Sequence, residues 1–568
     1  RLMSSHEKQL SSPGITSFQE FIRHADYSFK TNLRADPASR DDGNDHRARE
    51  VCSGHFVPVN PTPLPEPVYI THSYHLFEQL GLQDVLIKDR DFIKMFSGDC
   101  ASINSPQCMG WATGYALSIY GTEYNQQCPF GTGNGYGDGR AISVFEGLLN
   151  EKRWEMQLKG SGPTPYCRGA DGRAVLRSSV REFLAQELMH ALGIPTTRSL
   201  TLFASQSQTV MRPWYSEQSQ SQDPDVLVDN PIAISTRVSS SFLRVGQLEL
   251  FARRVRLDAH PQAFEELKMI VMHLIAREYK NEIDQSLHFS DQIVLLARTF
   301  RERLSSLVAN WLRVGYCQGN FNSDNCAAGG FTLDYGPFGF CELFDPQFQP
   351  WTGGGGHFAF LNQPVAAEAN FHMFWKSLRL LILDNDKNLE ELDQIRKDFE
   401  SHMQAKLQDM WAKKLGLAQY DRQLCDGLLQ LLELSKVDFT IFFRELSHLP
   451  TDFSALNKSF YTPLPQQLEV QWQSWFDQWS RLIASANNQQ AISQNMLKIN
   501  PKYTWREWLI VPAYEQASRG DYSLIHQIQA ILNQPYEEQT QAIEDQYYRL
   551  RPDSFFYAGG VSHYSCSS

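Results

Sequence analysis

The spacing of apolar residues changes character near the middle of the chain. From about residue 130 to 245, short segments of alternating apolar and polar residues dominate, which is the pattern of half-buried β-strands. From about residue 261 onward, apolar residues recur at helical spacing over long stretches, for example 264–279 and 371–383. A β-rich half followed by a helical half predicts an α+β protein with two lobes, and a cleft between lobes is a usual place for a ligand.

Three segments interrupt this pattern. Residues 205–225 are rich in Gln and Ser and predict a surface loop or insertion. The glycine run at 353–356 predicts a flexible loop between helices. Residues 1–55 are polar and charge-rich, so we expect them to form an extension outside the core.

Residues 153–159 alternate cleanly and end in a lysine. Trp154, Met156 and Leu158 point to one face of the predicted strand, and the polar residues between them point to the other. Lys159 therefore lies at a strand end on the polar face. A single lysine in such a place is most often solvent-facing, but a nucleotide phosphate site also requires one.

A helix is predicted shortly after this strand, across a turn-rich connection. Apolar residues at 180, 183, 184, 188, 191 and 192 form one stripe, and Gly193 with Pro195 closes the helix. Ser179 and Glu182 match the S-x-x-E capping box, which would make Glu182 a helix cap. The functional alternative is an ion pair that steadies the lysine against phosphates, as in kinases. The sequence leaves both interpretations open.

The segment 320–336 carries the strongest geometric argument. Two short apolar runs flank a Gly-Gly pair and predict a hairpin with a two-residue turn. In that register Asn325 faces Asp334 with Cβ atoms roughly 5 Å apart, and two oxygen ligands so placed suit a hard cation that also binds phosphate. Asp324 lies beside the pair, where a carboxylate could accept a proton from an incoming hydroxyl. The competing interpretation is an Asn- and Asp-rich loop that caps its own backbone.

A glycine-rich loop and two arginines complete the candidate nucleotide site. The stretch 131–140 has glycine at every second position and precedes a predicted strand, so its backbone N–H groups could approach phosphates closely. Such loops are more often only flexible turns, and no Walker sequence follows. Arg237 and Arg244 flank a Ser-rich turn, and two guanidiniums suit a triphosphate, although surface arginines are the commoner explanation.

Composition excludes several classes of protein. With 568 residues, 42% hydrophobic and 20% charged, the chain is typical of a globular protein of two or three domains, or of one large two-lobed unit with extensions. A formal net charge of −12 argues against a general nucleic-acid binder, and no apolar run approaches the roughly 20 residues that span a bilayer. Ten cysteines without a C-x-x-C pair indicate reduced, mostly buried thiols. Cys566 is the exception, because a terminal tail is exposed by default.

Several stretches of the chain are specific enough to compare with known families: GDGRAI at 137–142, LKGSGPTPY at 158–166, RSSVREF at 177–183, SFLRVG at 241–246, NSDN at 322–325 and DYGPFGF at 334–340. Together with NPKY at 500–503, GDYS at 520–523 and PYEEQ at 535–539, they resemble the selenoprotein O family of protein adenylyltransferases, over about residues 56–568. The Lys-Gly…Arg-Ser-Ser-x-Arg-Glu block is the most specific part of this resemblance.

The resemblance implies a two-lobed, protein-kinase-like fold with extensions at both ends. The expected parts are a polar N-terminal extension at 1–55, a β-rich N-lobe at 56–240, a helical C-lobe at 241–490 and a C-terminal extension at 491–568.

It further implies that ATP lies flipped in the cleft, so that AMP passes to Ser, Thr or Tyr hydroxyls of proteins and pyrophosphate is released. The implied roles are phosphate binding by Lys159, Arg237 and Arg244; completion of the nucleotide site by Gly137, Gly139, Arg140, Asp171 and Gly172; orientation of Lys159 by Glu182; ligation of Mg²⁺, with Mn²⁺ as an alternative, by Asn325 and Asp334; and general base catalysis by Asp324. Local reasoning alone favours phosphoryl transfer. The implied partners are ATP and protein substrates, with no nucleic acid and no membrane, in the cytoplasm of a bacterium or the mitochondria of a eukaryote.

The chain departs from the family pattern in three places. The family's Tyr-x-Gly-His-Gln-Phe-Gly stretch appears at 124–131 without its histidine, and Gln318 replaces a histidine before the NSDN segment. Many members carry an activation-loop cysteine that can pair with the terminal Cys or selenocysteine, but 344–351 contains none. A redox partner of Cys566 would then be Cys341 or an external thiol. The first two departures affect the expected substrate range and rate more than nucleotide binding.

Three other functions compete with AMP transfer. The chain could be a kinase that moves the γ-phosphate, a nucleotide-binding pseudokinase that scaffolds partners, or a thiol oxidoreductase centred on Cys566.

Overall fold

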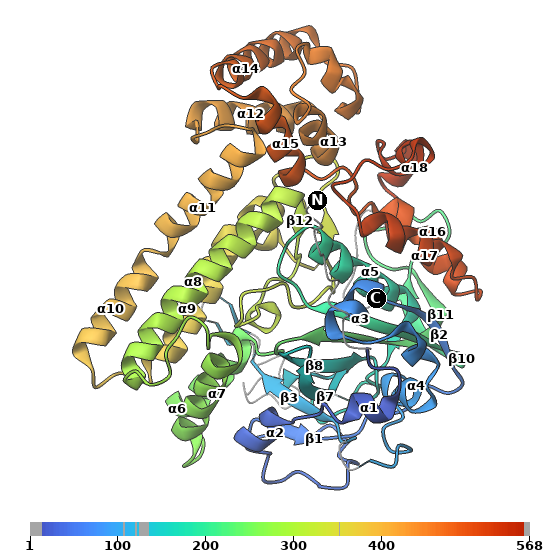
Figure 1. Ribbon diagram of the computed structural model, residues 1–568, viewed down its shortest axis with the longest axis vertical. Helices are drawn as coiled ribbons and strands as arrows, with labels where there is room; N and C mark the ends of the chain where they lie inside the picture. Colours follow the sequence, from blue (N-terminus) through green and yellow to red (C-terminus); the bar gives the residue numbers. More distant parts are fainter. Residues whose placement is uncertain are drawn as a thin grey trace, which may run out of the picture.

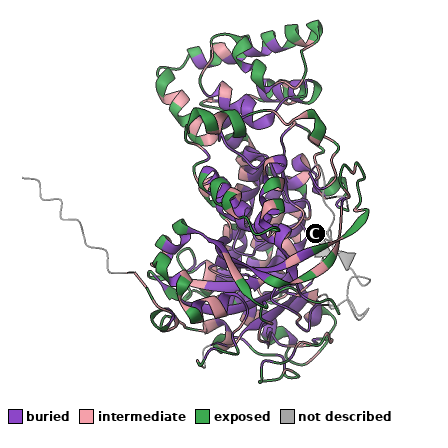
Figure 2. Ribbon diagram, turned by 90° about the vertical axis from the view of Figure 1, so that its right-hand side faces the viewer, coloured by how far each residue is buried: buried purple, intermediate pink, exposed green. Residues whose placement is uncertain are grey.

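The structure is a computed structural model that describes residues 14–105, 108–116, 118–119, 122–123, 136–167, 169–351 and 353–561. It is a mixed α and β protein in which one large antiparallel sheet occupies one end and helices make up the rest (Figure 1). Buried residues concentrate in the sheet and the helices that adjoin it, whereas the helices farthest from the sheet carry many exposed residues (Figure 2).

The main sheet runs in the order β1-β3-β7-β8-β11-β10-β2, with β6 paired to β3 and β9 paired to β11. Its strands are β1 (Phe56–Pro58), β2 (Pro67–His72), β3 (Trp111–Tyr115), β6 (Tyr136–Gly137), β7 (Ala141–Leu149), β8 (Lys152–Lys159), β9 (Ala174–Val175), β10 (Arg198–Trp214) and β11 (Val226–Ser239). Two short pairs lie outside it: β4 (Ser118–Ile119) with β5 (Thr122–Glu123), and β12 (Tyr316–Cys317) with β13 (Gly339–Phe340).

The two faces of β8 have the composition that the alternation predicts. Met156 and Leu158 belong to a hydrophobic cluster that also contains Phe21 and Phe92 from the N-terminal helices. The polar residues Glu155 and Gln157 are buried as well, so the opposite face is enclosed by protein and is not a solvated surface.

Helices surround the sheet and form the remainder of the chain. Those of the first half are α1 (Phe18–Ile22), α2 (Ser28–Asn32), α3 (Tyr74–Leu80), α4 (Arg90–Phe96) and α5 (Leu176–Ala191). Those that follow the sheet are α6 (Val245–Arg256), α7 (Ala263–Glu278), α8 (Phe289–Val314), α9 (Gln363–Arg379), α10 (Asp386–Lys397), α11 (Phe399–Lys414), α12 (Arg422–Leu434), α13 (Phe439–Leu446), α14 (Gln466–Ala484), α15 (Gln489–Ile499), α16 (Glu507–Ala517), α17 (Ser523–Leu532) and α18 (Gln541–Tyr547).

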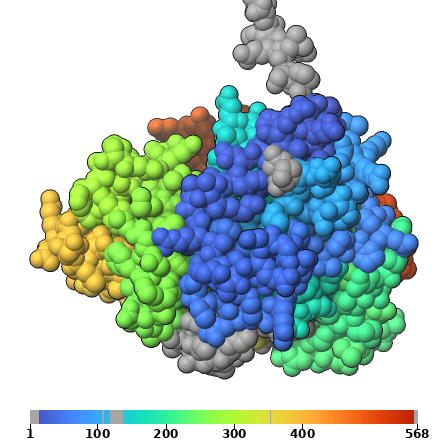
Figure 3. All heavy atoms as spheres, turned by 90° about the horizontal axis from the view of Figure 1, so that it is seen from below, coloured from blue at the N-terminus to red at the C-terminus, as the bar shows by residue number. Residues whose placement is uncertain are grey.

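The expectation that residues 1–55 lie outside the core is wrong for their described part, 14–55. Phe18, Phe21 and Phe29 are buried, and Ala25 forms a β-bridge with Gly147 of β7. Figure 3 shows residues of the first hundred positions, in blue, covering one face of the molecule. A few aromatic anchors spaced among charged residues are enough to dock this segment, although its average composition is polar.

The segment 205–225 is also different from the predicted loop. β10 continues through it to Trp214 and pairs with β11 from Val226 to Pro231, beyond a register shift between Ala204 and Thr209. The turn itself is limited to 215–225. This outer part of the hairpin is largely exposed on both faces, so it lacks the alternation that marks a half-buried strand.

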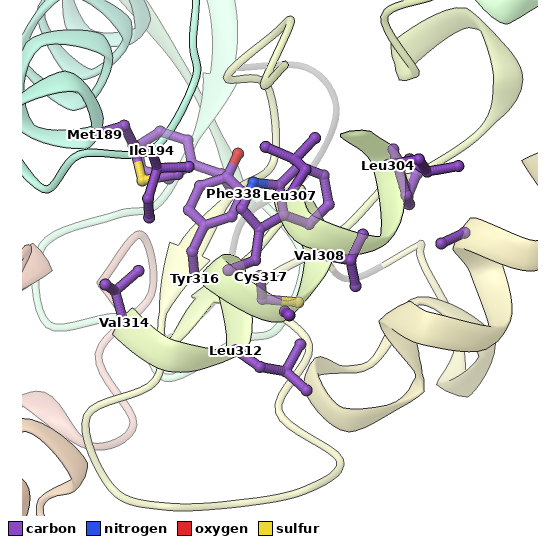
Figure 4. Packing of buried hydrophobic residues seen from close by; sticks show 14 of the residues in the cluster. Met189, Ile194, Leu304, Leu307, Val308, Leu312, Val314, Tyr316, Cys317 and Phe338 are labelled. Carbon is purple, nitrogen blue, oxygen red and sulfur yellow. The ribbon is translucent and has the colours of Figure 1, made fainter. Parts of the chain in front are cut away.

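The largest hydrophobic cluster joins α5 to the helical part of the chain. Figure 4 shows Met189, in the last turn of α5, and Ile194, just after the helix, near Phe338 and Tyr316. On the other side Leu312 and further residues of α8 complete the packing. The end of α5 and the segment that follows Asp334 are therefore packed against the same core.

The C-terminal helices contact α5 directly. The guanidinium of Arg181 donates from Nε to Glu507 of α16 at 2.8 Å and from Nη2 to the Phe338 carbonyl at 3.2 Å. Both side chains of this ion pair are buried. The residue next to Arg181 in the chain is Glu182, so α16 braces the helix turn that carries it.

The described residues contain neither a disulfide nor a membrane-spanning helix. Eight cysteines lie there, all with free thiols, and seven of them are buried. Among the same residues, none of the helices is long and apolar enough to cross a bilayer.

Candidate active site

A cavity of about 400 Å³ lies between the end of the sheet, the start of α6 and the segment 320–337. The residues that line this cavity come from five stretches that are far apart in the sequence and that the fold brings together. The lining residues are Tyr115, Tyr136, Gly137, Asp138, Gly139, Arg140, Ala141, Lys159, Tyr166, Cys167, Ala170, Arg237, Arg244, Asn320, Asp324, Asn325, Asp334, Gly336 and Pro337.

Neighbouring strands bring two cations together at this cavity. In the β8–β11 ladder Lys159 faces Ser235 and Gln157 faces Arg237, so Lys159 and Arg237 lie on the same face, two positions apart. Lys159 Nζ lies 2.9 Å and Arg237 Nη1 2.8 Å from Oδ1 of Asp334. Burial alone would raise the pKa of Asp334, but Lys159 and Arg237 outweigh it and hold that pKa well below its ordinary value.

Glu182 is part of the same charge cluster and is not a helix cap. Its carboxylate lies 3.0 Å from Lys159 Nζ and 3.4 Å from Arg237 Nη1. α5 begins at Leu176, so Glu182 lies in its second turn, and the Ser179 hydroxyl donates to the Val175 carbonyl instead of capping a helix end. The capping-box interpretation is therefore wrong, because the helix starts at Leu176, four residues earlier than the motif implies.

The Arg244 side chain reaches the cavity from the residue before α6. It donates from Nη1 to Asp138 at 2.7 Å and lies over the Tyr115 ring, with Cζ 4.2 Å from the ring centroid. Asp138 also accepts from the Thr113 hydroxyl. The charge of Asp138 is the largest factor that raises the pKa of Arg244, against the opposing effect of burial. The guanidinium is thus held between Tyr115 of β3 and Asp138, the residue that follows β6.

The Asp324 carboxylate lies in an unusual environment at the cavity. Asp324 lies in the 3₁₀ turn Ser323–Asn325 and is partly buried as a whole residue. Its Oδ1 atom is shielded from solvent and has no hydrogen-bond partner within the described chain. Burial raises the pKa of Asp324 to about 7, with Arg244 acting to lower it and Asp334 to raise it. A base that titrates near neutral pH is well matched to proton transfer under physiological conditions.

The predicted hairpin register is wrong by one residue. Cys326 forms an isolated bridge with Thr332, so Asn325 is not paired with Asp334, and Asn325 itself lies in the 3₁₀ turn. Residues 326–328 instead bond to the segment before α6, through Val245 N to the Cys326 carbonyl and Ala328 N to the Leu243 carbonyl. Tertiary pairing therefore overrides the local two-residue turn. Asn325 and Asp334 still line the same cavity, by a different route from the one predicted.

Gln318 fills the position of the expected histidine with a structural role. Its Nε2 donates to the Asp334 carbonyl at 2.9 Å, and its Oε1 accepts from the Tyr316 hydroxyl at 2.7 Å. The side chain is buried. Gln318 therefore fixes the backbone of Asp334 and does not itself line the cavity.

Nine of the predicted site residues line the cavity: Gly137, Gly139, Arg140, Lys159, Arg237, Arg244, Asp324, Asn325 and Asp334. Glu182 is in contact with two of them. Asp171 and Gly172 do not line it, although they follow Ala170, which does. The Asp171 carboxylate binds Arg212 at 2.8 Å. Burial is the largest single influence and raises the pKa of Asp171, but the Arg173 N–H and Arg212 together outweigh it and lower that pKa.

Sequence reasoning missed Asp138, three tyrosines and Asn320 among the lining residues. Asp138 lies inside the Gly137-Asp138-Gly139 motif, so its position was signalled although its pairing with Arg244 was not. Tyr136 lies in the glycine-rich stretch and Tyr166 ends the LKGSGPTPY motif, but Tyr115 carries no sequence signal that separates it from core aromatics. Residues 131–135 of the glycine-rich loop, the 124–131 stretch and Cys566 lie outside the described residues.

The oxygen atoms of the cavity suit a metal cation that takes most of its coordination from bound phosphates and water. Within the described residues, no group of three or more His, Cys, Asp and Glu side chains is placed to bind a metal alone. Asp334 supplies one carboxylate and Asn325 one amide oxygen, and the unpartnered Oδ1 of Asp324 lies in the same cavity. Mg²⁺ usually takes one or two carboxylates and completes its shell with phosphates and water.

Comparison with known proteins supports the family resemblance seen in the sequence motifs. A family model described as "Protein adenylyltransferase SelO" matches residues 44–533. A relative from Xanthomonas campestris pv. campestris, named "Protein nucleotidyltransferase YdiU", is 33% identical over 552 residues, which cover 95% of this chain and 99% of its own. Relatives with the same name from an Azoarcus species and from Flavobacterium johnsoniae are each 34% identical, and cover 96% and 95% of this chain and 99% and 98% of their own.

Proposed function

Because the chain belongs to the SelO family, we propose that it is a protein adenylyltransferase that moves AMP from ATP to Ser, Thr or Tyr hydroxyls of proteins. The observation that supports this most is the single cavity that unites Lys159, Arg237 and Arg244 with Asp324 and Asp334. Three cations beside a carboxylate that titrates near pH 7 are the groups that phosphate binding and hydroxyl deprotonation require.

Each group has a defined task in this reaction. Asp324 accepts the proton of the acceptor hydroxyl, and the resulting oxygen attacks the α-phosphorus of ATP. The bond between the α-phosphorus and the bridging oxygen breaks, and pyrophosphate leaves with the electron pair. Lys159, Arg237 and Arg244 neutralise the charge that develops on the phosphate oxygens. Glu182 orients Lys159, from which it lies 3.0 Å away.

Asn325 and Asp334 would hold a divalent cation, which we propose to be Mg²⁺ with Mn²⁺ as an alternative. Such an ion would add positive charge beside the leaving pyrophosphate. Because Asp334 also contacts Lys159 and Arg237, bound phosphates would have to draw those two cations away from it. Nucleotide and metal are therefore expected to bind cooperatively.

The remaining nucleotide contacts come from the glycine-containing turn and its neighbours. Gly137 has no room for a side chain, since a Cβ there would lie 2.0 Å from the Thr113 carbonyl oxygen. We propose that Gly137, Gly139 and Arg140 cover the nucleotide, and that Asp171 and Gly172 complete the site at the edge marked by Ala170.

We further propose that the arrangement is a two-lobed, kinase-like fold. The strand lysine and helix glutamate belong to the sheet-containing part, and Asp324 and Asp334 belong to loops of the helical part, as in kinases. A kinase that moves the γ-phosphate would use the same groups, so the transferred group decides between the two. The bacterial relatives favour the cytoplasm as the location.

The test is transfer of label from ATP to a protein acceptor such as casein. Label from α-labelled ATP, together with a mass increase equal to AMP, is expected. Asp324→Ala should abolish it while the far-ultraviolet circular dichroism spectrum and ATP binding are retained. Label that arises only from γ-labelled ATP would establish a kinase and overturn the proposal.

A further inference from the structure

A second cavity, of about 560 Å³, lies between the last two turns of α9 and α10 and the end of α6. α9 packs against both α6 and α10, which lie on either side of it in Figure 1. We call this cavity the basic groove and define it by its charged lining residues: Arg256, Lys376, Arg379, Asp393, Arg396 and Lys397.

The groove concentrates positive charge on an acidic protein. Its described lining contains five Lys and Arg residues and one carboxylate, Asp393, a formal charge of +4, whereas the whole chain carries −12. Asp393 is already engaged, since it accepts from Trp375 Nε1 at 2.9 Å and Arg379 Nε at 3.2 Å. An anion that enters the groove would therefore meet more cations than carboxylates.

Helix ends account for part of this charge. The cations belong to the last turns of α6, α9 and α10, where a basic residue is favoured by the helix dipole. Each helix end offsets roughly half a charge, so three ends leave an excess of about +2.5. Outside the lining, burial and Glu400 raise the pKa of Glu368, which lies close enough to Arg396 for that arginine to act against them and lower it. A dipole does not explain why three helix ends face one cavity.

The groove has an apolar component as well. The Trp375 ring is flanked by two guanidiniums, with Arg396 Cζ at 4.9 Å and Arg379 Cζ at 5.8 Å from its centroid. Leu383 lines the groove and is 51% exposed, and Leu380 lines it beside Trp375. A ligand that matches both components carries negative charges next to an apolar side chain.

We propose that the basic groove binds an acidic segment of the protein substrate that also presents an apolar side chain. This inference rests on the proposed function, because it assigns the groove to the acceptor protein. It gives the enzyme a contact with the acceptor that is separate from the reacting hydroxyl, and such contacts mainly lower KM.

α6 sets the distance between the groove and the reaction centre. Arg244 precedes its first turn at the active-site cavity, and Arg256 is its last residue, twelve positions later at the groove. At about 1.5 Å per residue the two ends are on the order of 18 Å apart. An extended peptide covers this span with roughly six residues. The acceptor hydroxyl is therefore expected at least about six residues from the acidic segment.

The binding test uses two fluorescein-labelled peptides and does not depend on catalysis. One contains four Glu residues around a Leu and a Phe, followed by an eight-residue Gly-Ser spacer and a single Tyr. The other has Gln in place of each Glu. Fluorescence anisotropy with the full chain is expected to give at least tenfold tighter binding of the acidic peptide, weakened by added salt.

Two pairs of charge reversals test the location. Lys376→Glu with Lys397→Glu lowers the net charge of the groove by four units and should weaken acidic-peptide binding at least tenfold. Lys280→Glu with Lys498→Glu makes the same change in total charge at two exposed positions that follow or end other helices, and should leave binding within about twofold. In the transfer assay the groove pair should raise KM for the acidic peptide and leave kcat and the KM for ATP unchanged.

The outcomes separate this inference from the proposed function. Acidic and neutral peptides of equal affinity, or equal losses in the two variant pairs, would overturn it. Displacement of the acidic peptide by inorganic phosphate at equal concentration would also overturn it, in favour of a small-anion site. Normal peptide binding without any AMP transfer would support the groove and refute the proposed activity.

Discussion

The Asp324 carboxylate should destabilise the folded protein at the pH where the enzyme works. Its pKa is raised from an ordinary value of 3.8 to about 7 by burial. The folded state therefore binds a proton more tightly than the unfolded state, and stability falls as pH rises from about 4 to about 7. Replacement of Asp324 by Asn, which keeps the shape and removes the ionisation, should remove this pH-dependent loss.

The magnitude follows from the shift. A difference of roughly 3 pKa units corresponds to an upper limit of ~4 kcal/mol in the free energy of unfolding. The residue is only partly buried, and solvent screening reduces the effect to about 2 kcal/mol. Asp324→Asn is thus expected to be more stable than the wild type by about 2 kcal/mol at pH 8, to match it near pH 4.5, and to have no transfer activity.

The assay is urea unfolding in metal-free buffer at pH 4.5, 6 and 8, read as the difference between variant and wild type at each pH. Exposed Asp41→Asn is the matched control and should give a difference that does not change with pH. In the wild type, kcat/KM should rise with pH through about 7 as the base loses its proton. An Asp324→Asn variant that is equally or less stable than the wild type at pH 8 would refute the reasoning.

Three further substitutions test other contacts. Glu507→Gln removes the negative charge opposite Arg181 and should lower the free energy of unfolding by about 3 kcal/mol, measured by urea titration, with reduced AMP transfer; an unchanged midpoint would contradict the bracing role. Gly246→Val places a Cβ 2.4 Å from the Ala116 carbonyl oxygen and should reduce kcat/KM at least tenfold by moving the start of α6; wild-type kinetics would show that the contact relaxes freely. Asp171→Asn disrupts a partly exposed ion pair, so stability should change by less than about 1 kcal/mol, while KM for ATP should rise about threefold or more; an unchanged KM would remove Asp171 from the nucleotide site.

Local chemistry was enough to predict the parts of the site that depend on one element. The alternation around Lys159 and the stripe of α5 depend on which faces are buried, and that information is in the residue types themselves. Asp324, Asn325 and Asp334 lie at one cavity, as predicted, but part of the reasoning behind that prediction was wrong. The hairpin register was derived from a Gly-Gly turn, but residues 326–328 pair with residues 243–245 at the start of α6.

The remaining failures share a physical cause. The outer half of the β10–β11 hairpin is exposed on both faces, so nothing in its residue types distinguishes it from a loop. The docking of residues 14–55 depends on a few aromatic side chains, which average composition conceals. The pairing of Arg244 with Asp138 joins residues 106 positions apart, and no local pattern encodes such a contact.

The ion pair between Arg181 and Glu507 has a consequence for protein synthesis. The two residues are separated by 326 positions, and at roughly 5–20 residues per second a ribosome needs about 16 to 65 seconds to cover that distance. During this interval the sheet, α5 and the loops around Asp324 have all been made, but the brace on α5 has not. A nascent chain thus carries all the groups proposed for the site before Glu507 is available to hold the turn of α5 that bears Glu182.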